Sequence, residues 1–414
     1  MKFGLLTQWY DPEPGPAALP GTLARGLVER GHDVRVLTGF PNYPTGAIAE
    51  GYRVRPRQHE VLDDIDVTRV ALYPSHKGSP ASRMLTYGSF GATAATVGLP
   101  ALRGLDALWV NYSPVTLAPA MLLATKALRV PSVCHVADLW PDTLAASGVD
   151  ESSAVGRWAM KGSGVAADAM YRAASFVSYI SPGVHEALLE RGVPEHKLAY
   201  TPMWANEDLF HPGAAQMHDE LALSPEQVVL VYAGSIGEAQ GLQTLIEACA
   251  QVEDERFVCL IAGSGTAEES LKARVSELGL RNVRFLGRVA PERMSNLLAT
   301  ADAAYIGLNE HPLAQITMPS KTQATLGAGC PLLVAGRGDV AQVARESRAG
   351  WCVPSGDAPA LAAAIGEICA TDRAQLDQLG HQARQYYEET FAVRAGVDRL
   401  ESLLARAASG RKNT

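Results

Sequence analysis

The stretch Val228–Ile246 constrains the fold of this chain more than any other, because it joins a buried strand, a glycine turn and a helix start. Its first five residues are apolar and mostly β-branched, which is typical of a strand buried in a parallel sheet. Three glycines and the first residue of a helical apolar pattern follow: Gly234, Gly237, Gly241 and Leu242. Glycines let the backbone approach a ligand closely, and the N–H groups of a first helical turn attract anions. The pattern predicts a diphosphate site, and so a nucleotide-linked substrate.

Two alternatives to this interpretation of the glycines have to be weighed. The first is that they only form a tight turn between strand and helix. The second is a dinucleotide oxidoreductase, which needs an acidic residue at the end of the next strand to hold a ribose. That strand, FVCLIAGSG, ends in Gly263-Ser264-Gly265 without a carboxylate, so the oxidoreductase is disfavoured.

Apolar strands alternate with helical segments in both halves of the chain, which predicts a parallel, doubly wound sheet in each half. In the N-terminal half the expected strands are Lys2–Thr7, Asp33–Leu37, Val67–Val70, Ala107–Val110, Pro131–Val136 and Phe176–Ile180. In the C-terminal half they are Val228–Tyr232, Phe257–Ala262, Val283–Leu286, Ala303–Ile306, Pro331–Val334 and Gly350–Val353.

A length of 414 residues suits two domains, since one domain usually takes about 150–200 residues. The stretch Leu198–Pro212 has no clear period and contains two prolines, which indicates a linker. We expect an N-terminal domain, a linker, a C-terminal domain and a helical segment packing back toward the N-terminal domain, over residues 1–200, 201–215, 216–388 and 389–414; the family resemblance given below implies that the first domain binds the acceptor and the second the nucleotide-sugar. Ligands of such sheets bind beyond the carboxyl ends of the strands, which predicts a site in a cleft between the two domains.

Charge and cysteine content narrow the class of protein. With 44 acidic and 36 basic residues the net charge is −8, whereas nucleic-acid binding needs a basic surface. The six cysteines show no C-x-x-C spacing. We therefore expect reduced thiols, as in a cytoplasmic protein, and no metal site.

Two segments bear on targeting. The N-terminal MKFGLLTQWY leads from a short strand into a loop and does not have the form of a signal peptide. The stretch Met84–Leu102 is uncharged and about long enough to cross a bilayer. Its Ala, Gly and Thr residues and Pro100 favour a buried or membrane-touching helix over a spanning one.

A lysine is expected in the first turn of a further helix. Pro319 and Ser320 are residues that start helices, so Lys321 would project from the first turn. A cation there opposes the helix dipole by about 0.3–1 kcal/mol, which is explained if Lys321 meets an anion held by the same amides. The alternative is a lysine that is simply solvated at the surface.

His135 and Asp138 follow one another at the exit of the strand Pro131–Val136. Three positions apart at a strand end, the two side chains can face one cleft. They can equally be a core histidine with satisfied hydrogen bonds and an aspartate that caps a helix. The residues alone leave both interpretations open.

Taken together, these motifs resemble the retaining glycosyltransferases of family 4, which have the GT-B fold of two Rossmann-like domains facing a cleft. The resemblance is strongest to the bacterial O-antigen, capsule and colanic-acid branch, and it runs over nearly the whole chain. The segments that carry it are GFPNYPTG (Gly39–Gly46), HVADLWPD (His135–Asp142), YAGSIGEAQG (Tyr232–Gly241), IAGSG (Ile261–Gly265), VRFLGRV (Val283–Val289), ADAAYI (Ala301–Ile306) and MPSKTQATLGAGCP (Met318–Pro331).

The resemblance implies an enzyme that transfers a hexosyl or N-acetylhexosaminyl group from a nucleotide-sugar, usually a UDP-sugar, to a hydroxyl acceptor. Transfer would retain the anomeric configuration and require no metal or other cofactor. The acceptor would be a sugar, a lipid-linked sugar or a natural product, in cell-surface polysaccharide or glycosylated natural-product biosynthesis. The expected location is cytoplasmic, with peripheral contact with the inner membrane face where the acceptor is lipid-linked.

The resemblance also implies roles for individual residues. The donor is expected to contact Gly234, Ser235, Gly237, Gly241, Gly263, Gly265, Arg288, Thr317, Pro319, Ser320, Lys321 and Gln323. The acceptor side is expected at Glu13, Gly15 and Tyr43. The expected catalytic residues are His135, which matches a cleft histidine that contacts the donor sugar, Asp138 as its helper, and Lys321 on the leaving diphosphate.

Two departures from the family pattern affect the donor site. Many members carry an Arg and a Lys in the first glycine loop, where this chain has Glu238, Ala239 and Gln240. Many also have two glutamates eight positions apart, where this chain has Ile316 and Ala324. Ribose and sugar contacts would then come from Gln315, Thr317 or Gln323. The departures keep two other functions open, a UDP-sugar 2-epimerase of the same fold and a non-catalytic nucleotide-sugar-binding protein.

Overall fold

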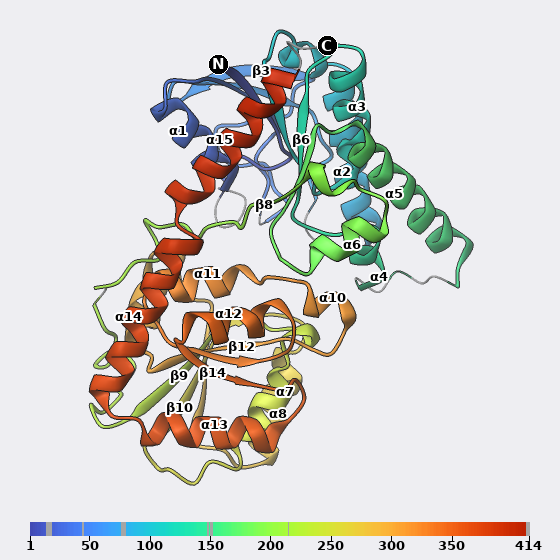
Figure 1. Cartoon of the computed structure of the whole chain (residues 1–414). Helices are drawn as coiled ribbons and strands as arrows, with labels where there is room; N and C mark the ends of the chain where they lie inside the picture. Colours follow the sequence, from blue (N-terminus) through green and yellow to red (C-terminus); the bar gives the residue numbers. More distant parts are fainter. Residues whose placement is uncertain are drawn as a thin grey trace. The chain divides into compact units, whose positions relative to one another are not determined.

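The computed structural model describes residues 1–410 except 14–18, 44, 76–79, 147–148, 150–151 and 214. The chain divides into two units (Figure 1). The N-terminal unit comprises Met1–Pro202 and the C-terminal segment that begins at Arg394, and the C-terminal unit comprises Met203–Val393. The first boundary falls inside the segment expected as a linker.

Among the described residues, the N-terminal unit has an eight-stranded sheet in the order β3-β4-β2-β1-β5-β6-β7-β8. Its strands are β1 Lys2–Leu6, β2 Asp33–Gly39, β3 Arg57–Leu62, β4 Ile65–Val70, β5 Ala107–Asn111, β6 Ser132–Val136, β7 Phe176–Tyr179 and β8 Leu198–Tyr200. All neighbours pair in parallel except β3 and β4, which are antiparallel. The expected parallel sheet is confirmed.

The two edge strands of this sheet, β3 and β8, were not expected from the sequence. β3 alternates exposed and half-buried residues and contains charged side chains, so it lacks the apolar run of a central strand. β8 has three residues, all half-buried, and lies within the stretch interpreted as a linker. Edge strands bury little side-chain surface, and their sequence signal is correspondingly weak.

The helices of the N-terminal unit are α1 Leu19–Glu29, α2 Pro80–Ala95, α3 Ala118–Lys126, α4 Asp142–Ala146, α5 Ala154–Ala173, α6 Val184–Glu190 and α15 Val393–Gly410, with short 3-10 turns η2 Leu99–Leu102, η3 Val115–Leu117 and η4 Glu195–Lys197. The stretch Met84–Leu102 is therefore not one helix. It breaks after Ala95, where the Gly98 amide bonds back to the Thr93 carbonyl and Pro100 opens the 3-10 turn. In the described part of the chain, no helix is long and apolar enough to cross a membrane.

The last helix, α15, returns to the N-terminal unit (Figure 1). The guanidinium of Arg30, just after α1, lies 2.6 Å from Asp398 Oδ1, and His32 Nε2 lies 2.8 Å from Glu401 Oε1. The Arg406 guanidinium lies 4.5 Å above the centroid of the Phe176 ring. The chain thus ends in the unit in which it begins.

The C-terminal unit has a six-stranded parallel sheet in the order β11-β10-β9-β12-β13-β14, counted over the described residues. Its strands are β9 Val228–Ser235, β10 Phe257–Ser264, β11 Val283–Gly287, β12 Ala303–Gly307, β13 Leu332–Ala335 and β14 Gly350–Val353. Its helices are α7 Leu242–Cys249, α8 Glu268–Glu277, α9 Met294–Thr300, α10 Pro312–Gln315, α11 Ser320–Gly327, α12 Asp339–Ser347, α13 Ala358–Ala370 and α14 Arg373–Thr390, with 3-10 turns η5 Glu238–Gln240 and η6 Pro291–Arg293.

Strand β9 shows why this sheet is doubly wound. Val228, Leu230 and Tyr232 pack into the cluster formed with α7 and α13. Val229 and Val231, one residue out of phase, pack into the opposite cluster with α9. Successive side chains of a strand point to opposite faces, so an unbroken apolar run requires helices on both faces.

Candidate functional site

The strand order of the C-terminal unit reverses between β9 and β12, which makes their carboxyl ends the topological switch point. The loops after these strands touch one another there. The Asn309 amide donates to the Ala239 carbonyl at 3.0 Å, and the Tyr305 hydroxyl donates to the Gly241 carbonyl at 3.1 Å. Open parallel sheets bind ligands at this position, so the predicted glycine turn lies where a donor site belongs.

Two of the predicted donor glycines, Gly263 and Gly265, are explained by strand packing. Gly263 pairs with Gly234 in the β9–β10 register, and a Cβ on Gly263 would lie 1.8 Å from the Gly234 carbonyl oxygen. A Cβ on Gly265 would lie 2.2 Å from the Ile236 carbonyl oxygen. The close approach of two backbones requires glycine here, whatever is bound.

Gly237 and Gly241 have different surroundings. A Cβ on Gly237 would meet only the end of the flexible Gln240 side chain. Gly241 has φ +60 and separates η5 from α7, so it supplies the left-handed residue of the turn. The space around Gly237 thus remains open to a ligand.

Lys321 is brought to the glycine turn by α11. Its Nζ donates to the Tyr232 hydroxyl at 3.0 Å and lies 4.2 Å above the Tyr232 ring centroid. A Cβ on Gly234 would lie 3.2 Å from the same Nζ. Lys321 is therefore not a solvated surface lysine, and this alternative is wrong.

The charge of Lys321 is left without a described counter-ion. Its Nζ contacts the hydroxyl and the ring of Tyr232, and within the described ranges no carboxylate lies in ion-pair distance of it. Burial lowers the pKa of Lys321 to about 8. An anion bound beside Nζ would stabilise the charged form, because an opposite charge offsets the lost hydration.

The first turn of α11 adds amide donors to this position. Pro319 stands at the N-cap and, in the described structure, no side chain caps the helix. Ser320 is exposed, whereas Gln323 is buried and its Oε1 has no described partner. The Thr317 hydroxyl is already bonded to the Leu313 carbonyl at 2.6 Å. Of the three residues suggested to replace the missing glutamates, Thr317 is the one whose hydroxyl proton is already used in a hydrogen bond within the protein.

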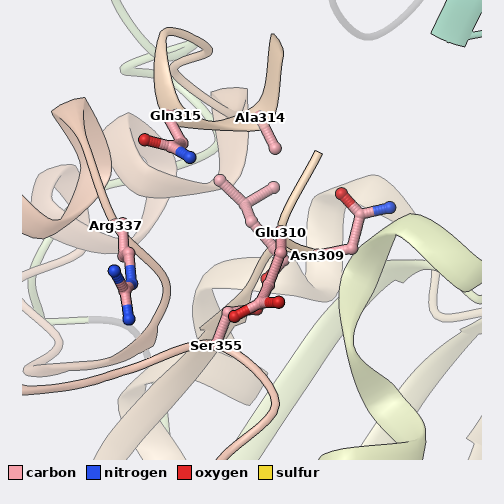
Figure 2. A pocket seen from close by; sticks show the side chains of 7 residues that line it. Asn309, Glu310, Ala314, Gln315, Arg337 and Ser355 are labelled. Atoms are coloured by element: carbon pink, nitrogen blue, oxygen red, sulfur yellow. The ribbon is translucent and has the colours of Figure 1, made fainter. Parts of the chain in front are cut away.

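A pocket of about 230 Å³ opens beside these loops, at the carboxyl ends of β12, β13 and β14. Figure 2 shows the Gln315 amide, the Arg337 guanidinium and the Glu310 carboxylate around this hollow. It is lined by Leu308, Asn309, Glu310, Ala314, Gln315, Arg337 and Ser355. A cation, a carboxylate and two amides together suit the hydroxyl groups of a sugar.

A second, larger hollow of about 680 Å³ shares Asn309, Glu310 and Ser355 with this pocket and reaches Gly237 and Gly241. The glycine turn lines the larger hollow, which adjoins the polar pocket through these shared residues. Sequence reasoning missed Arg337 and Glu310. Both follow the carboxyl end of an expected strand by a few residues, which is the signal that identifies them.

Arg288, expected in the nucleoside pocket, is exposed after β11. Its Nε donates to the Ser264 hydroxyl at 2.7 Å. It thus stands beside the turn that contains Gly263 and Gly265, at the carboxyl ends of β10 and β11. Ser235, another predicted donor contact, is exposed at the end of β9.

His135 is part of the sheet of the N-terminal unit and is 1% exposed. Its Nδ1 lies 2.8 Å from the Ser178 hydroxyl, and its ring lies 5.3 Å from that of Trp109. Burial lowers the pKa of His135 to about 3. This geometry favours the core histidine over a histidine that exchanges protons with a substrate.

Asp138 follows β6 and accepts a hydrogen bond from the Ser113 hydroxyl at 2.5 Å. Burial raises the pKa of its carboxyl group, while the bond from Ser113 lowers it. The helix that follows begins at Asp142, so Asp138 does not cap it. The proposed helix-cap role is therefore wrong.

Glu13, one of the expected acceptor residues, binds backbone amides of two loops. The Glu13 carboxylate accepts bonds from the amides of Asn42 and Tyr43, both at 2.8 Å, and of Tyr10 at 3.1 Å. Glu13 is 4% exposed, and burial raises its pKa while the three amides oppose this. Glu13 thus ties the loop after β2 to the loop after β1, and its acceptor contact stays a prediction. Gly15 lies outside the described residues.

Comparison with known families identifies the chain. Residues 15–204 match the family described as "Glycosyl transferase 4-like domain", and residues 227–371 match "Glycosyl transferases group 1". The chain belongs to family 4 of the glycosyltransferases. The resemblance stated from the sequence motifs is confirmed, and glycosyltransferase activity follows from it.

Curated relatives of this glycosyltransferase are themselves named glycosyltransferases, and some of the names include colanic acid biosynthesis. It is 27% identical over 327 residues to the protein named colanic acid biosynthesis glycosyl transferase WcaI of Escherichia coli, covering 77% of this chain and 79% of the relative. It is 25% identical over 292 residues to the glycosyltransferase WbjE of Pseudomonas aeruginosa, covering 68% of this chain and 71% of the relative.

Solved structures show the fold. Sucrose-phosphate synthase from Thermosynechococcus elongatus superposes with a TM-score of 0.73, at 19% identity over 99% of both chains. Anabaena Alr3699/HepE in complex with UDP-glucose superposes with a TM-score of 0.65, at 16% identity over the full length of both chains. The predicted GT-B fold is confirmed.

Proposed function

We propose that this glycosyltransferase transfers a sugar from a UDP-sugar to a hydroxyl acceptor, with retention at the anomeric carbon, in the synthesis of a cell-surface polysaccharide. The observation that carries the proposal is Lys321, a largely buried cation against the glycine turn at the switch point. The names of relatives such as WcaI support the polysaccharide, and the UDP-glucose in a structure of the same fold supports the donor.

The diphosphate would lie between Lys321 and the amides of two helix starts, at Gly237 and at Ser320. The pocket of Figure 2 would take hydroxyl groups of the sugar or ribose. Arg337, exposed at its rim and without an ion pair among the described residues, would supply a second cation. It would thereby replace the Arg and Lys that this chain lacks in its glycine loop.

The proposed reaction requires no side-chain nucleophile. The bond between the anomeric carbon and the phosphate oxygen breaks while the acceptor oxygen forms its bond on the same face. The acceptor proton passes to the leaving phosphate. Fixed cations and amides stabilise the charge that develops on the diphosphate, which is the largest contribution in many enzymes. In this proposal His135 and Asp138 hold their neighbours in position in the N-terminal unit, and neither takes part in a proton transfer.

The test is an assay of UDP release with a panel of UDP-sugars, with and without candidate acceptors. A transferase releases UDP with an acceptor and gives a product whose anomeric proton shows the donor configuration by NMR. A new UDP-sugar without acceptor would instead identify a 2-epimerase, and binding heat without any product a non-catalytic protein. Addition of a chelator tests whether a metal is needed.

A further inference from the structure

Helix α5 turns an apolar edge to solvent. Val155, Trp158 and Val165 are 81%, 78% and 59% exposed, and Gly162 continues the row between them. Positions three and four apart lie on one face of a helix. The opposite face, with Ser163, Ala167 and Met170, is buried in the N-terminal unit. The exposed apolar row is therefore not the core side of this helix.

A groove of about 670 Å³ lies between this row and two neighbouring helices. Helices α2, α3 and α5 lie alongside one another in the N-terminal unit (Figure 1). α2 contributes Met84, Gly88 and Ala92, which are four residues apart, and α3 contributes Ala118 and Leu122. Met84 and the adjacent Leu85 are 38% and 53% exposed.

The size of this apolar surface calls for a partner. Single exposed apolar side chains are normal, but a contiguous patch that is also hollowed marks an interaction site. The groove is lined mainly by small and aliphatic residues, with the buried Trp140 in its wall and the exposed Trp158 at its rim. Such a surface offers dispersion contacts and almost no hydrogen-bond donors, so it suits an apolar partner.

The exposed charges that α2 and α5 place beside the groove are positive, and the Asp142 carboxylate of α4 is paired with Arg191. Arg157 and Lys161 are exposed on α5 next to Trp158, and Arg83 is exposed on α2 next to Met84. α2 carries no acidic residue, and the only one on α5 is Asp168, about two turns beyond Lys161. Asp150 and Glu151, which precede α5, lie outside the described residues. A local excess of cations on a chain of net charge −8 indicates an anionic partner.

These features match a helix that lies in a membrane interface. Interfacial helices combine an apolar face containing Trp with Lys and Arg beside it. A second copy of the chain fits less well, because a twofold contact would bring Arg157 and Lys161 of both copies to the same patch. Charge complementarity therefore favours an anionic bilayer.

We propose that the surface formed by α2, α3 and α5 binds an anionic lipid bilayer. Val155, Trp158 and Val165 would enter the boundary between headgroups and acyl chains, with Arg83, Arg157 and Lys161 against the lipid phosphates. The inference deepens the proposed function, since it implies an acceptor held at a membrane. It also extends the expected membrane-touching stretch Met84–Leu102, whose residues on α2 line the groove, to α5, which carries the most exposed apolar residues.

The experiment is co-sedimentation of the full chain with vesicles of phosphatidylcholine alone or mixed with phosphatidylglycerol. We expect retention on the mixed vesicles that weakens as salt shortens the range of electrostatic attraction. Trp158→Ser should weaken retention on the order of tenfold. The double variant Arg157→Gln/Lys161→Gln should weaken it by at least about tenfold on mixed vesicles.

Matched controls lie elsewhere in the N-terminal unit. Val61→Ser removes an apolar side chain of β3 that is 58% exposed, and Arg55→Gln removes an exposed cation. Both should leave retention unchanged. Circular dichroism of each variant verifies the fold, which surface substitutions should preserve.

The inference is overturned if wild-type protein is not retained on anionic vesicles, or if Trp158→Ser is retained equally. It is also overturned if light scattering shows a dimer that Trp158→Ser dissociates, which would make the groove a self-association face. UDP titration on the same samples separates the two proposals. A chain that binds vesicles but no UDP or UDP-sugar loses the proposed function and keeps the membrane surface.

Discussion

Lys321 shows how one residue can be assigned from its surroundings. It stands on α11 but contacts the end of β9, where its Nζ meets Tyr232 and the open side of Gly234. A lysine in this environment loses hydration without gaining a described carboxylate. The arrangement is unfavourable in the free protein and favourable once an anion binds, which is characteristic of a binding residue.

Lys321→Gln should therefore weaken UDP binding by about 30- to 160-fold, the effect of losing a charge-assisted hydrogen bond of about 2–3 kcal/mol. Titration calorimetry with UDP measures it. The matched control is Lys272→Gln, which removes an exposed lysine paired with Glu268 on α8 and should leave the affinity unchanged. Wild-type affinity in Lys321→Gln would contradict the assignment.

The pH dependence of stability gives an independent check on Lys321. Its pKa is about 8 in the folded chain and 10.5 ordinarily. Between these values the unfolded chain binds more protons, so Lys321 makes the free energy of unfolding rise with pH from about 8 to 10.5. UDP affinity should fall over the same range as Nζ loses its proton. Denaturant melts of wild type and Lys321→Gln should converge as pH rises, and parallel curves would contradict the shift.

His135 is predicted to act on the fold and not on protons. His135→Ala should destabilise the N-terminal unit by about 2–4 kcal/mol, because it leaves a cavity and unpaired hydroxyls around Ser178. The pKa of about 3 means that His135 stays neutral at neutral pH. As pH falls below 6.5 the unfolded chain takes up the proton first, so stability falls with pH. If His135→Ala is as stable as wild type but has lost turnover, this prediction is contradicted. The expected contact of His135 with the donor sugar would then be supported.

At the scale of elements, the ends of β9 and β10 carry two kinds of glycine. Gly263 and Gly265 allow two strands to approach, whereas Gly237 faces open space. Sequence alone treats them alike, since both kinds follow an apolar run. The distinction depends on which backbone lies opposite, and that is set by the β9–β10 pairing.

Substitution by alanine should separate the two kinds. Gly263→Ala places a Cβ 1.8 Å from a carbonyl oxygen at φ +141 and should cost about 2–4 kcal/mol of stability. Gly237→Ala should keep the melting temperature within a few degrees and weaken UDP binding, because the methyl group enters the donor space. Thermal melts and UDP titration measure both, and a stable Gly263→Ala would contradict the packing argument.

Elements with long apolar runs were predictable, and edge elements were not. The central strands of both sheets are buried on two faces, so their composition identifies them. β3 and β8 bury too little surface to leave a pattern. The break after Ala95 was missed because an uncharged run of Ala, Gly and Thr has no period that locates a helix end.

At the scale of the whole molecule, α15 belongs to the unit that the N-terminus forms. Val397, Leu400 and Leu404 are buried, and ion pairs join Arg30 to Asp398 and Glu401. Most of the free energy that α15 contributes to the stability of this unit comes from apolar burial, because partly exposed ion pairs add little.

Deletion of the chain from Arg394 should therefore destabilise the N-terminal unit selectively. The deletion exposes the apolar surface that α15 covers, which predicts lower solubility and faster proteolysis within residues 1–202. Limited proteolysis with mass spectrometry locates the cuts, and deletion from residue 411 is the control. Cuts confined to the C-terminal unit would contradict the prediction.

The sequence by itself determined the fold class, the order of the central strands along the chain and the glycosyltransferase family, because apolar runs and motif order are local properties. It also placed Lys321 and the glycine turn on the ends of their elements. Only the tertiary structure decided which residues meet: Lys321 with Tyr232 and Gly234, Glu13 with three amides, His135 inside a sheet, and the apolar row of α5 outside the core. Contacts between distant segments depend on pairing and burial, and no local pattern in the chain encodes them.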